Sequence, residues 1–487
     1  MSYNIFDEYV VRTALLPKSE YSNIFDNGDF NSEKYIEDRL NNPIVKEAIL
    51  VSSNKLYNNL KYFNQGKDSK KKRNAIYSLN KYFIRMTSRA TPYGLFGAIA
   101  YGTADQVSNI HSINNEKYVK HIKIDMEWLL KVLSNLEMQQ DVLEHLNLKW
   151  NPIAITSGAK VKIDYPSGWG IKFSGKPESN IQRTIRNSSL IEYVKNESIN
   201  EISYQALVNK TLFKVQEVNS SISLEDINRF INQLIQNEFI LTSLRPKLTN
   251  CNPFEEVINI TRNISSLQEI YTELEKINYL IDEYRKTSLG DGINLYTKVT
   301  ELMASLCKAD NYLQVDLSIN MEEIKLDRAV LDQVEETLNF LNKVLPHDTK
   351  RFSQLNQYLD LFIEEYGLHR EVSLIELLDI NKGLGSPYQL INYSLPKEND
   401  YETKFINTLK SEIFNAIRES KPEVYLDQCS ELLADATNIG RSKHANFPEN
   451  LELFVKVDFN STIATTISLI PYSGSDKVGK STGRFNY

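Results

Sequence analysis

The spacing of apolar residues predicts that strands and helices alternate in the first part of the chain. An extended apolar run over residues 9–16 is typical of a strand, and residues 69–89 repeat with the period of a long helix. Over residues 122–133 the sequence IKIDMEWLLKVL changes from a strand pattern to a helical pattern. We therefore expect residues 1–150 to form a mixed α and β region.

The pattern changes at about Asn151. Alternating apolar and polar residues flank a PSG turn within residues 161–173, which predicts a hairpin. Three short amphipathic segments then predict helices over residues 189–196, 204–213 and 224–239. Ser223 and Asp226 are placed for a capping box at the start of the third helix. A small sheet with three helices is the outline of a winged helix, which we predict over residues 151–246.

A winged helix alone is compatible with DNA binding or with a purely structural insert. The third predicted helix, EDINRFINQLIQNEF, carries one arginine among three acidic residues. This charge balance argues against DNA binding, because phosphate requires a basic surface.

Beyond Pro246 the chain becomes mostly helical. Helical periods predict helices over residues 267–282, 322–343 and 352–366. The strand-like LQVDLSI interrupts them at residues 313–319, and two alternating runs at 451–459 and 462–470 predict a final sheet. The fold class predicted from these patterns is α+β, with a large mixed α/β domain formed by residues 1–150 and 247–487 and the winged helix inserted into it.

Composition and charge exclude several classes of protein. With 41% hydrophobic and 24% charged residues the chain resembles an ordinary globular protein, and it contains neither a membrane-length apolar run nor a signal peptide, so we expect a cytoplasmic location. Its three cysteines lie too far apart for a disulfide framework or a zinc ribbon. The net charge of −7 argues against a surface that binds nucleic acid everywhere but allows a local basic patch.

Such a patch is present in KKKRNAIYSLNKYFIRMTSRATPYGLFG, residues 70–97. On a helix, every fourth position forms a ridge composed of Arg73, Tyr77, Lys81, Arg85 and Arg89. The buried face is predicted to consist of Ile76, Leu79, Phe83 and Ile84. The cluster of Lys70, Lys71, Lys72 and Arg73 extends the ridge, and guanidinium groups suit phosphate. The two interpretations are a solvated basic face and a site for an anionic polymer.

Two further motifs suggest other chemistry. GSDKVGKS at residues 474–481 matches a phosphate-binding loop, but the helix that such a loop needs does not follow it. Glu365 and His369 have the spacing of metal ligands on a helix, but Gly367 lies between them and no second pair is present. We therefore predict neither a nucleotide loop nor a metal site.

The arrangement of Arg85, Arg89 and Thr91 running into TPYGLF resembles the arginine, arginine, threonine motif of the lantibiotic dehydratase family, which serves glutamyl-tRNA binding and glutamylation. Further segments resemble that family in the same order along the whole chain. They are YVVRTALLP with Arg12, IKIDMEWL with Asp125, LQVDL with Asp316, REVSLIELLDINKGLGSPY without an assigned role, and GKSTGRF with Arg484.

The resemblance implies a glutamylation domain that moves glutamate from glutamyl-tRNA(Glu), its co-substrate, onto Ser and Thr of a precursor peptide. This is the first step towards dehydroalanine and dehydrobutyrine, and no bound cofactor is implied. Arg85, Arg89 and Thr91 would contact the tRNA 3′ end and the glutamyl group. Arg12 and Arg484 would be further anion contacts, and Asp125 and Asp316 would orient these arginines or the glutamate amine. The basic patch for tRNA would consist of Lys70, Lys71, Lys72, Arg73 and Lys81.

The resemblance also assigns the winged helix to the leader of the precursor peptide, which adds as a strand to the small sheet. The edge strand is then expected near residues 180–186, beside the helix at 224–239. The residues expected to contact the leader are Ile181, Arg183, Ile185, Phe230 and Leu234.

Family members continue into a domain that eliminates glutamate, and this chain stops before it. The resemblance therefore implies either a truncated form or fragment, or a chain whose elimination step is supplied by a separate protein. A cyclase would be a further partner. A homodimer and a peripheral membrane complex are left open. Two alternative functions are an ATP-dependent peptide aminoacyl-tRNA ligase and a fragment that binds leader without catalysis.

Overall fold

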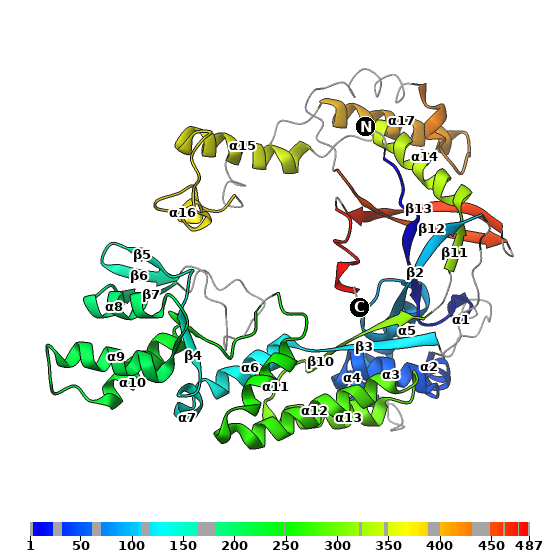
Figure 1. Cartoon of the computed structure of the whole chain (residues 1–487). Helices are drawn as coiled ribbons and strands as arrows, with labels where there is room; N and C mark the ends of the chain where they lie inside the picture. Colours follow the sequence, from blue (N-terminus) through cyan, green and yellow to red (C-terminus); the bar gives the residue numbers. More distant parts are fainter. Residues whose placement is uncertain are drawn as a thin grey trace. The chain divides into compact units, whose positions relative to one another are not determined.

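The computed structural model describes most of the chain and divides it into two compact units (Figure 1). The described residues are 3–22, 32–60, 70–106, 108, 117–163, 182–247, 249–320, 324–344, 349–387, 400–430, 449–460, 463–475 and 477–485. Unit 1 comprises residues 1–11, 101–112 and 321–487, and unit 2 comprises residues 12–100 and 113–320. Two of the boundaries between the units, at residues 11/12 and 100/101, therefore fall within the strands β1 and β2. The division into 1–150, 151–246 and 247–487 remains a prediction.

A mixed sheet runs through β1 and β2. Its strands are β1 (Glu8–Ala14), β2 (Gly97–Asp105), β10 (Leu313–Ile319) and β3 (Tyr118–Ile124), in that order, and β11 (Ile324–Asp327) also pairs with β2. In unit 2, β10 is parallel to β2 and antiparallel to β3 over seven residue pairs. Val315, Leu317 and Ile319 occupy alternate positions along β10, and all three are buried. The alternating apolar pattern therefore predicted this central strand correctly.

Unit 2 also contains helices outside the predicted winged helix. They are α1 (Ser19–Ser22), α2 (Ser32–Leu40), α3 (Pro43–Ser52), α4 (Asn54–Asn59), α5 (Lys70–Ser88), α6 (Met126–Leu136), α7 (Gln140–Leu143), α11 (Pro253–Arg262), α12 (Gln268–Lys286) and α13 (Ile293–Leu306). α12 and α13 lie side by side below β3 (Figure 1). α3 packs against the short turn η2 (Gly94–Phe96), which follows α5. α3 thus supports the end of the basic segment from within the core.

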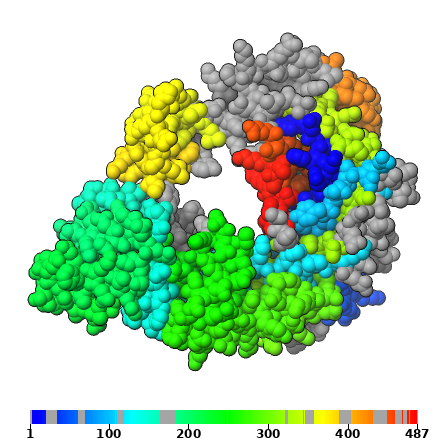
Figure 2. All heavy atoms as spheres, viewed as in Figure 1, coloured from blue at the N-terminus to red at the C-terminus, as the bar shows by residue number. Residues whose placement is uncertain are grey.

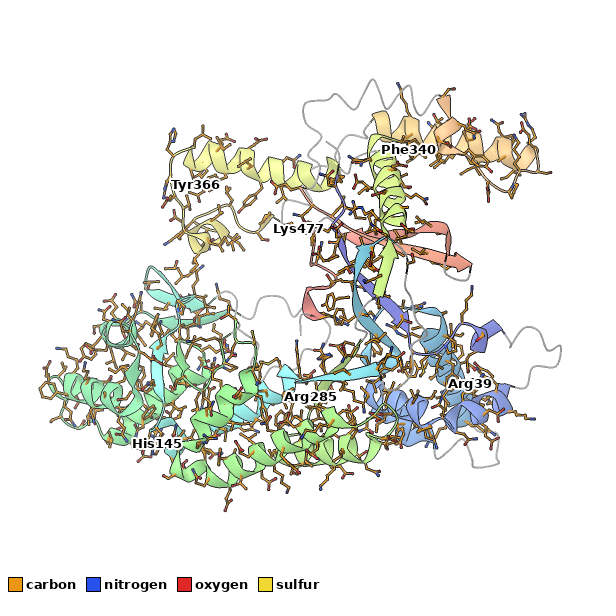
Figure 3. All side chains as sticks on the ribbon, turned by 45° about the vertical axis from the view of Figure 1, so that its right-hand side comes forward. Arg39, His145, Arg285, Phe340, Tyr366 and Lys477 are labelled. Carbon is orange, nitrogen blue, oxygen red and sulfur yellow. The ribbon has the colours of Figure 1, made fainter. Side chains whose placement is uncertain are left out.

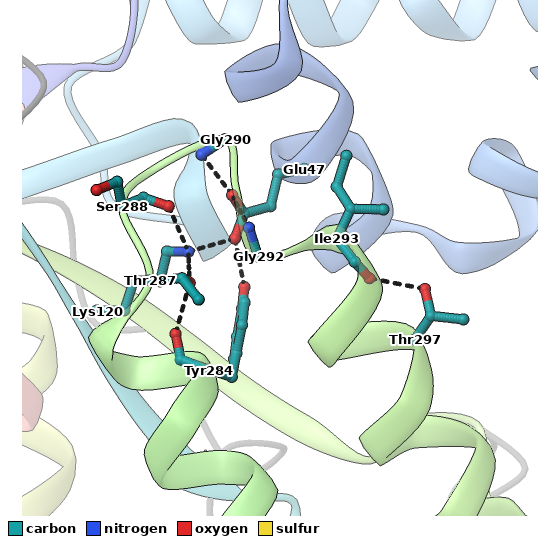
Figure 4. Close-up of polar contacts among 9 residues, drawn as sticks. All are labelled: Glu47, Lys120, Tyr284, Thr287, Ser288, Gly290, Gly292, Ile293 and Thr297. Atoms are coloured by element: carbon teal, nitrogen blue, oxygen red, sulfur yellow. Dashed lines mark hydrogen bonds and ion pairs between the residues drawn. The ribbon is translucent and has the colours of Figure 1, made fainter.

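A buried ion pair joins three distant segments of unit 2 (Figure 4). The Lys120 ammonium on β3 lies 2.5 Å from the Glu47 carboxylate on α3, and both side chains are buried. Glu47 also accepts hydrogen bonds from the Tyr284 hydroxyl at 2.9 Å and from the Gly290 amide at 2.5 Å. Burial lowers the pKa of Lys120, and Glu47 opposes that shift. Such a pair is tolerated because its remaining hydrogen-bonding capacity is satisfied.

Gly292 lets the backbone after α12 lie directly beside the side chains of Tyr284, Glu47 and Lys120. A Cβ atom at that position would lie 2.2 Å from the Tyr284 ring, 2.5 Å from Glu47 Oε1 and 2.7 Å from Lys120 Nζ. Only glycine therefore fits beside the ion pair. The pair holds the loop between α12 and α13 against α3.

The elements of the predicted winged helix are present in unit 2. α8 (Ser189–Ser198), α9 (Tyr204–Gln216) and α10 (Leu224–Gln236) accompany two small sheets, ordered β8 (Ile202–Ser203), β4 (Asn147–Trp150), β9 (Ile240–Thr242) and β5 (Ile155–Ser157), β6 (Lys160–Ile163), β7 (Arg183–Arg186). These helices form one solid body of atoms, drawn in green (Figure 2). The capping box of Ser223 and Asp226 is confirmed. β4 belongs to this small sheet, so the sheet begins before the predicted start at residue 151.

Unit 1 contains long helices and the final sheet. Its elements beyond residue 320 are β11, α14 (Arg328–Val344), α15 (Thr349–Tyr366), α16 (Leu374–Leu378), α17 (Asp400–Arg418), the antiparallel pair β12 (Glu452–Asn460) and β13 (Ile463–Ser475), and η7 (Gly483–Phe485). Phe340 of α14 packs with Phe405 of α17 and the buried Cys429 (Figure 3). The predicted final sheet is confirmed.

Two predictions of local structure were wrong. The helix expected over 322–343 begins only at Arg328, because Ile324 and Leu326 alternate inward from a short strand that pairs with β2. The hairpin expected within 161–173 differs as well. β6 pairs with β5 on one side and β7 on the other, and residues 164–173 lie outside the described part of the chain.

Candidate nucleic-acid interface

α5 buries one face and exposes a basic ridge. The buried residues are Ala75, Leu79, Phe83, Met86 and Thr87. Ile84 was predicted to share that face, but it is 40% exposed, because the helix turns its neighbours Phe83 and Met86 to the core instead. The Thr87 hydroxyl is satisfied by the Phe83 carbonyl at 2.9 Å, as a buried hydroxyl requires.

The opposite side of α5, with Arg89 directly after its end, carries the predicted cations. Lys70, Lys71, Arg73, Lys81 and Arg89 are exposed, and Lys72 and Arg85 are partly buried. None of the 19 residues of α5 is acidic. The helix therefore places no acidic side chain of its own beside these cations.

Arg85 connects the ridge to the turn that follows it. Its guanidinium carbon lies 4.5 Å from the centre of the Tyr93 ring, a cation–π contact. In the part of the chain that the structure describes, the buried Nε of Arg85 has no hydrogen-bond partner. A buried donor without a partner in a basic region is a position where an anionic ligand can supply the acceptor.

The turn at Thr91 lies against the strand that carries Arg12. The amides of Leu15 and Leu16 donate to the carbonyls of Phe96 and Met86, at 3.1 and 2.8 Å. An added Cβ at Gly97 would lie 3.1 Å from the Thr13 carbonyl and 3.4 Å from the Thr91 carbonyl. The fold therefore brings the end of β1 to the end of α5. Of the predicted residues, this places the segments of Arg12, Arg85, Arg89 and Thr91 together.

The two predicted aspartates lie at the start of α6 and on β10. Asp125 caps α6, and its carboxylate accepts the Glu127 amide at 2.9 Å. Burial raises the pKa of Asp125, which the Glu127 hydrogen bond opposes. Asp316 is only 3% exposed on β10, opposite His121 of β3, and accepts a hydrogen bond from Gln314 at 3.1 Å. Their role in orienting the arginines remains a prediction.

Arg484 belongs to unit 1, in the segment after β13. It is exposed, and its guanidinium carbon lies 4.3 Å from the centre of the Phe485 ring. The preceding loop, in which Lys477 is labelled in Figure 3, donates hydrogen bonds to the carboxylate of Glu452 on β12. Glu452 accepts hydrogen bonds from the amides of Gly479 at 2.6 Å and Ser481 at 3.1 Å.

The Ser481 and Thr482 hydroxyls also donate to Glu452. Burial alone would raise the pKa of Glu452, but the hydrogen bonds from Ser481, Gly479 and Thr482 outweigh it and lower the pKa. The donors that a phosphate-binding loop would offer to a nucleotide are thus bonded to the protein's own carboxylate. This supports the prediction that GSDKVGKS is not a nucleotide site.

The predicted edge strand of the winged helix is observed. β7 pairs with β6 and is the last strand of its sheet among the described residues. Arg183 links β7 to the end of α10, because its guanidinium donates to the Gln236 carbonyl at 3.1 Å and lies 3.5 Å from buried Glu238. Ile185 is partly buried.

The other expected leader contacts have different surroundings. Phe230 is partly exposed on α10, whereas Leu234 is only 4% exposed and packs in the core of the module. Its burial argues against direct contact with a peptide. Ile181 lies outside the described residues.

A sequence profile described as "Lantibiotic dehydratase, N terminus" matches residues 41–487. The chain belongs to this lantibiotic dehydratase family. It is 27% identical to the subtilin biosynthesis protein SpaB of Bacillus subtilis over 100% of this chain and 46% of that protein. It is 26% identical to the epidermin biosynthesis protein EpiB of Staphylococcus epidermidis over 98% of this chain and 46% of that protein. The chain thus spans about half the length of these relatives.

Solved structures of other proteins share the fold of this lantibiotic dehydratase family member. The tRNA-dependent lantibiotic dehydratase MibB from Microbispora sp. 107891 aligns with a TM-score of 0.75 and 22% identity, over 97% of this chain and 44% of MibB. The glutamylation domain of TbtB from thiomuracin biosynthesis aligns with a TM-score of 0.54 and 12% identity, over 87% of this chain and 52% of that one. At these identities the likeness concerns the fold.

Sequence reasoning on this lantibiotic dehydratase family member missed two features. One is the pair of Glu47 and Lys120, for which the only signal was the presence of charged residues within the apolar runs VKEAILV and YVKHI. The other is Tyr93, which lies in the TPYGLF motif but was not assigned a contact. Among the described residues, no helix has the length and apolarity of a membrane span, and no acidic, histidine and cysteine side chains gather in a way that could hold a metal.

Proposed function

We propose that this chain transfers glutamate from glutamyl-tRNA to Ser and Thr hydroxyls of a precursor peptide held by the winged helix. The observation that carries this proposal is the basic ridge of α5, which ends at Arg85, Arg89 and the turn of Thr91. The family membership gives the context of lantibiotic dehydration. MibB is described as tRNA-dependent and TbtB as a glutamylation domain, and this chain shares their fold.

The position of the lysine cluster supports a ligand rather than a stabilising role. Lys70 to Arg73 form the first turn of α5, and that turn has no acidic residue. The helix dipole places positive charge at this end, so each cation there costs about 0.3–1 kcal/mol. Four cations at this end of the helix, in a chain of net charge −7, form a local positive surface that suits a polyanion.

The transfer itself is an exchange of esters. The Ser or Thr oxygen attacks the glutamyl carbonyl carbon, the bond to the tRNA ribose oxygen breaks, and the hydroxyl proton finally resides on that ribose oxygen. The aminoacyl ester is already activated, so the protein must mainly position the groups and stabilise the oxyanion. No covalent enzyme intermediate or bound cofactor is needed.

Each predicted residue has a place in this scheme. Arg85, Arg89 and Thr91 contact the 3′ end and the glutamyl group, and Arg12 and Arg484 are further anion contacts. Asp125, at the start of α6, and Asp316, on β10, orient these arginines or the glutamate amine. The tRNA body contacts the patch of Lys70, Lys71, Lys72, Arg73 and Lys81, and the leader adds to β7 as a further strand.

Intact-mass analysis tests the proposal. The chain is incubated with a leader-bearing precursor peptide, glutamate, glutamyl-tRNA synthetase and tRNA(Glu), with and without each component. The expected result is a set of glutamyl adducts that require tRNA. Binding of the leader with an unchanged peptide mass would contradict transfer.

Among the residues that the structure describes, β7 has no strand on its outer edge, which favours one second candidate, a protein that binds leader without catalysis. The same mass experiment separates the two functions. An ATP-dependent peptide ligase would instead require ATP after the tRNA has been charged and purified. The bonding of the loop at 479–482 to Glu452 argues against ATP at that loop.

A further inference from the structure

Two exposed tyrosines lie along the basic ridge, and the ring of each makes a cation–π contact with a basic side chain. Tyr77 is 64% exposed, and the Lys81 ammonium lies 4.2 Å from the centre of its ring. Tyr93 is 45% exposed, and Arg85 lies 4.5 Å from the centre of its ring. The ridge therefore alternates aromatic faces with positive charge.

Contacts with Phe96 and Arg85 hold the ring of Tyr93 in position. Its ring lies 5.9 Å from the ring of Phe96, which is fully buried and also contacts Tyr82 at 5.1 Å. Because Phe96 and Arg85 fix its orientation, Tyr93 can offer its exposed surface to a ligand at little cost in conformational entropy.

Exposed aromatic rings beside cations suit unpaired nucleotides. Every base has a π face that stacks on an aromatic ring, and the neighbouring cations bind the phosphates on either side. A double helix hides these base faces, so the ligand must present a single strand.

We propose that Tyr77 and Tyr93 form a stacking platform for the unpaired nucleotides at the 3′ end of the tRNA. This inference rests on the proposed function. Tyr93 lies two residues from Thr91, so it stacks on the terminal nucleotide that carries the ester. Tyr77 precedes Arg85 by eight residues, about 12 Å along the helix, and stacks on a nucleotide further inside the strand.

The test uses the full chain and two RNA hairpins with the same acceptor stem, one with the single-stranded 3′ tail and one blunt. Tyr77→Leu and Tyr93→Leu remove the π face, and Tyr77→Phe and Tyr93→Phe keep it. We expect each Leu variant to bind the tailed hairpin about 5- to 100-fold more weakly, without loss on the blunt hairpin, and each Phe variant to bind normally.

The salt dependence of binding separates stacking from charge. The Leu variants should keep the wild-type slope of log affinity against log salt, whereas Lys81→Ala should lower the slope by about 0.7–0.9. With 2-aminopurine at the last nucleotide, quenching should disappear in Tyr93→Leu, and with the probe further inside it should disappear in Tyr77→Leu.

Two results would overturn the stacking platform: wild-type affinity of both Leu variants for the tailed hairpin, or equal losses on tailed and blunt hairpins. If the wild type transfers glutamate and binds RNA while the Leu variants are unaffected, only this inference fails. If the wild type shows no salt-dependent RNA binding, the proposed function fails first. Unchanged thermal unfolding of the variants excludes misfolding as the cause of a loss.

Discussion

α5 and α10 are built on the same plan but distribute charge in opposite ways. Each helix buries an apolar face, and each is exposed on the other side. α10 begins with Glu225 and Asp226, both within 3.6 Å of its single arginine, Arg229, and it starts with a capping box. α5 begins with four cations and has no acidic residue.

The difference shows which helix is arranged for its own stability. In α10 the acidic residues suit the positive end of the helix dipole and neutralise Arg229. In α5 the cations of the first turn oppose the dipole, and the helix supplies no acidic residue of its own. A polyanion therefore has reason to bind α5 and not α10, although the two helices belong to the same unit.

The largest effect is expected for the arginines at the end of α5, measured against the arginine of α10. Arg85→Ala or Arg89→Ala should reduce glutamyl transfer on the order of 100-fold, because a charged hydrogen bond contributes about 1.5–3 kcal/mol. Arg229→Ala on α10 is the matched control and should leave transfer unchanged. Transfer is followed by intact mass, and leader affinity by fluorescence anisotropy. Equal losses for the Arg85 and Arg229 variants would remove the distinction between the helices.

The lysine cluster should affect affinity through charge alone. Replacing Lys70, Lys71, Lys72 and Arg73 by Gln should lower the slope of log affinity for tRNA against log salt by about 0.7–0.9 for each phosphate that is no longer neutralised. The same variant should be more stable to heat, because the unfavourable dipole interaction is removed. A salt titration with tRNA and a thermal melt measure the two effects. An unchanged slope would assign these cations to a solvated face.

A smaller effect is expected at the leader site beside α10. The Asn187 amide donates to Ala159 on the β6 side, so the alternation of an antiparallel strand turns the amides of Thr184 and Arg186 outward. Thr184→Pro should weaken leader binding about 3- to 10-fold by removing one of these donors.

Thr184→Val keeps the amide and should bind leader normally. Binding is measured with a labelled leader peptide. Equal affinity of the Pro and Val variants would show that the leader does not pair with this edge, and tRNA binding should be unaffected in both variants.

The smallest effect concerns Glu452, whose carboxylate already fills the donors at Gly479 and Ser481. Glu452→Gln should lower the melting temperature by a few degrees at neutral pH, which corresponds to about 1 kcal/mol for a partly exposed group. The pKa of Glu452 is lowered from its ordinary 4.5 in the folded state. Its stabilisation is therefore complete above pH 4.5 and is lost as the pH falls through the lower, folded-state value.

The difference in melting temperature between wild type and Glu452→Gln should thus shrink in acid. Thermal melts across that pH range measure it. A difference that stays constant into strong acid would mean that the ionised carboxylate is not the stabilising form.

Local periodicity predicted the parts of the fold that depend on neighbouring residues. α5, the capping box of Ser223, and the strand before Asp125 followed from spacing and from residue type. The edge strand β7 followed from the family resemblance. The short strand β11 was missed because four residues before a helix carry too little pattern to distinguish the two periods.

Features that depend on tertiary contacts were not predictable from one sequence. The burial of Leu234 and the exposure of Ile84 are decided by which neighbours pack on each helix. Likewise, nothing in the sequence pairs Glu47 with Lys120, which are 73 residues apart. The position of Arg12 beside the turn of Thr91 follows from strand order, which periodicity does not give.

The buried Glu47 also constrains when unit 2 can complete its fold during synthesis. Its carboxylate needs the Lys120 ammonium and the Gly290 amide, which is 243 residues further along the chain. At a ribosomal rate of about 5–20 residues per second, tens of seconds pass between the synthesis of Glu47 and that of its last partner. Glu47 therefore gains its complete set of partners only after the loop between α12 and α13 has been synthesised.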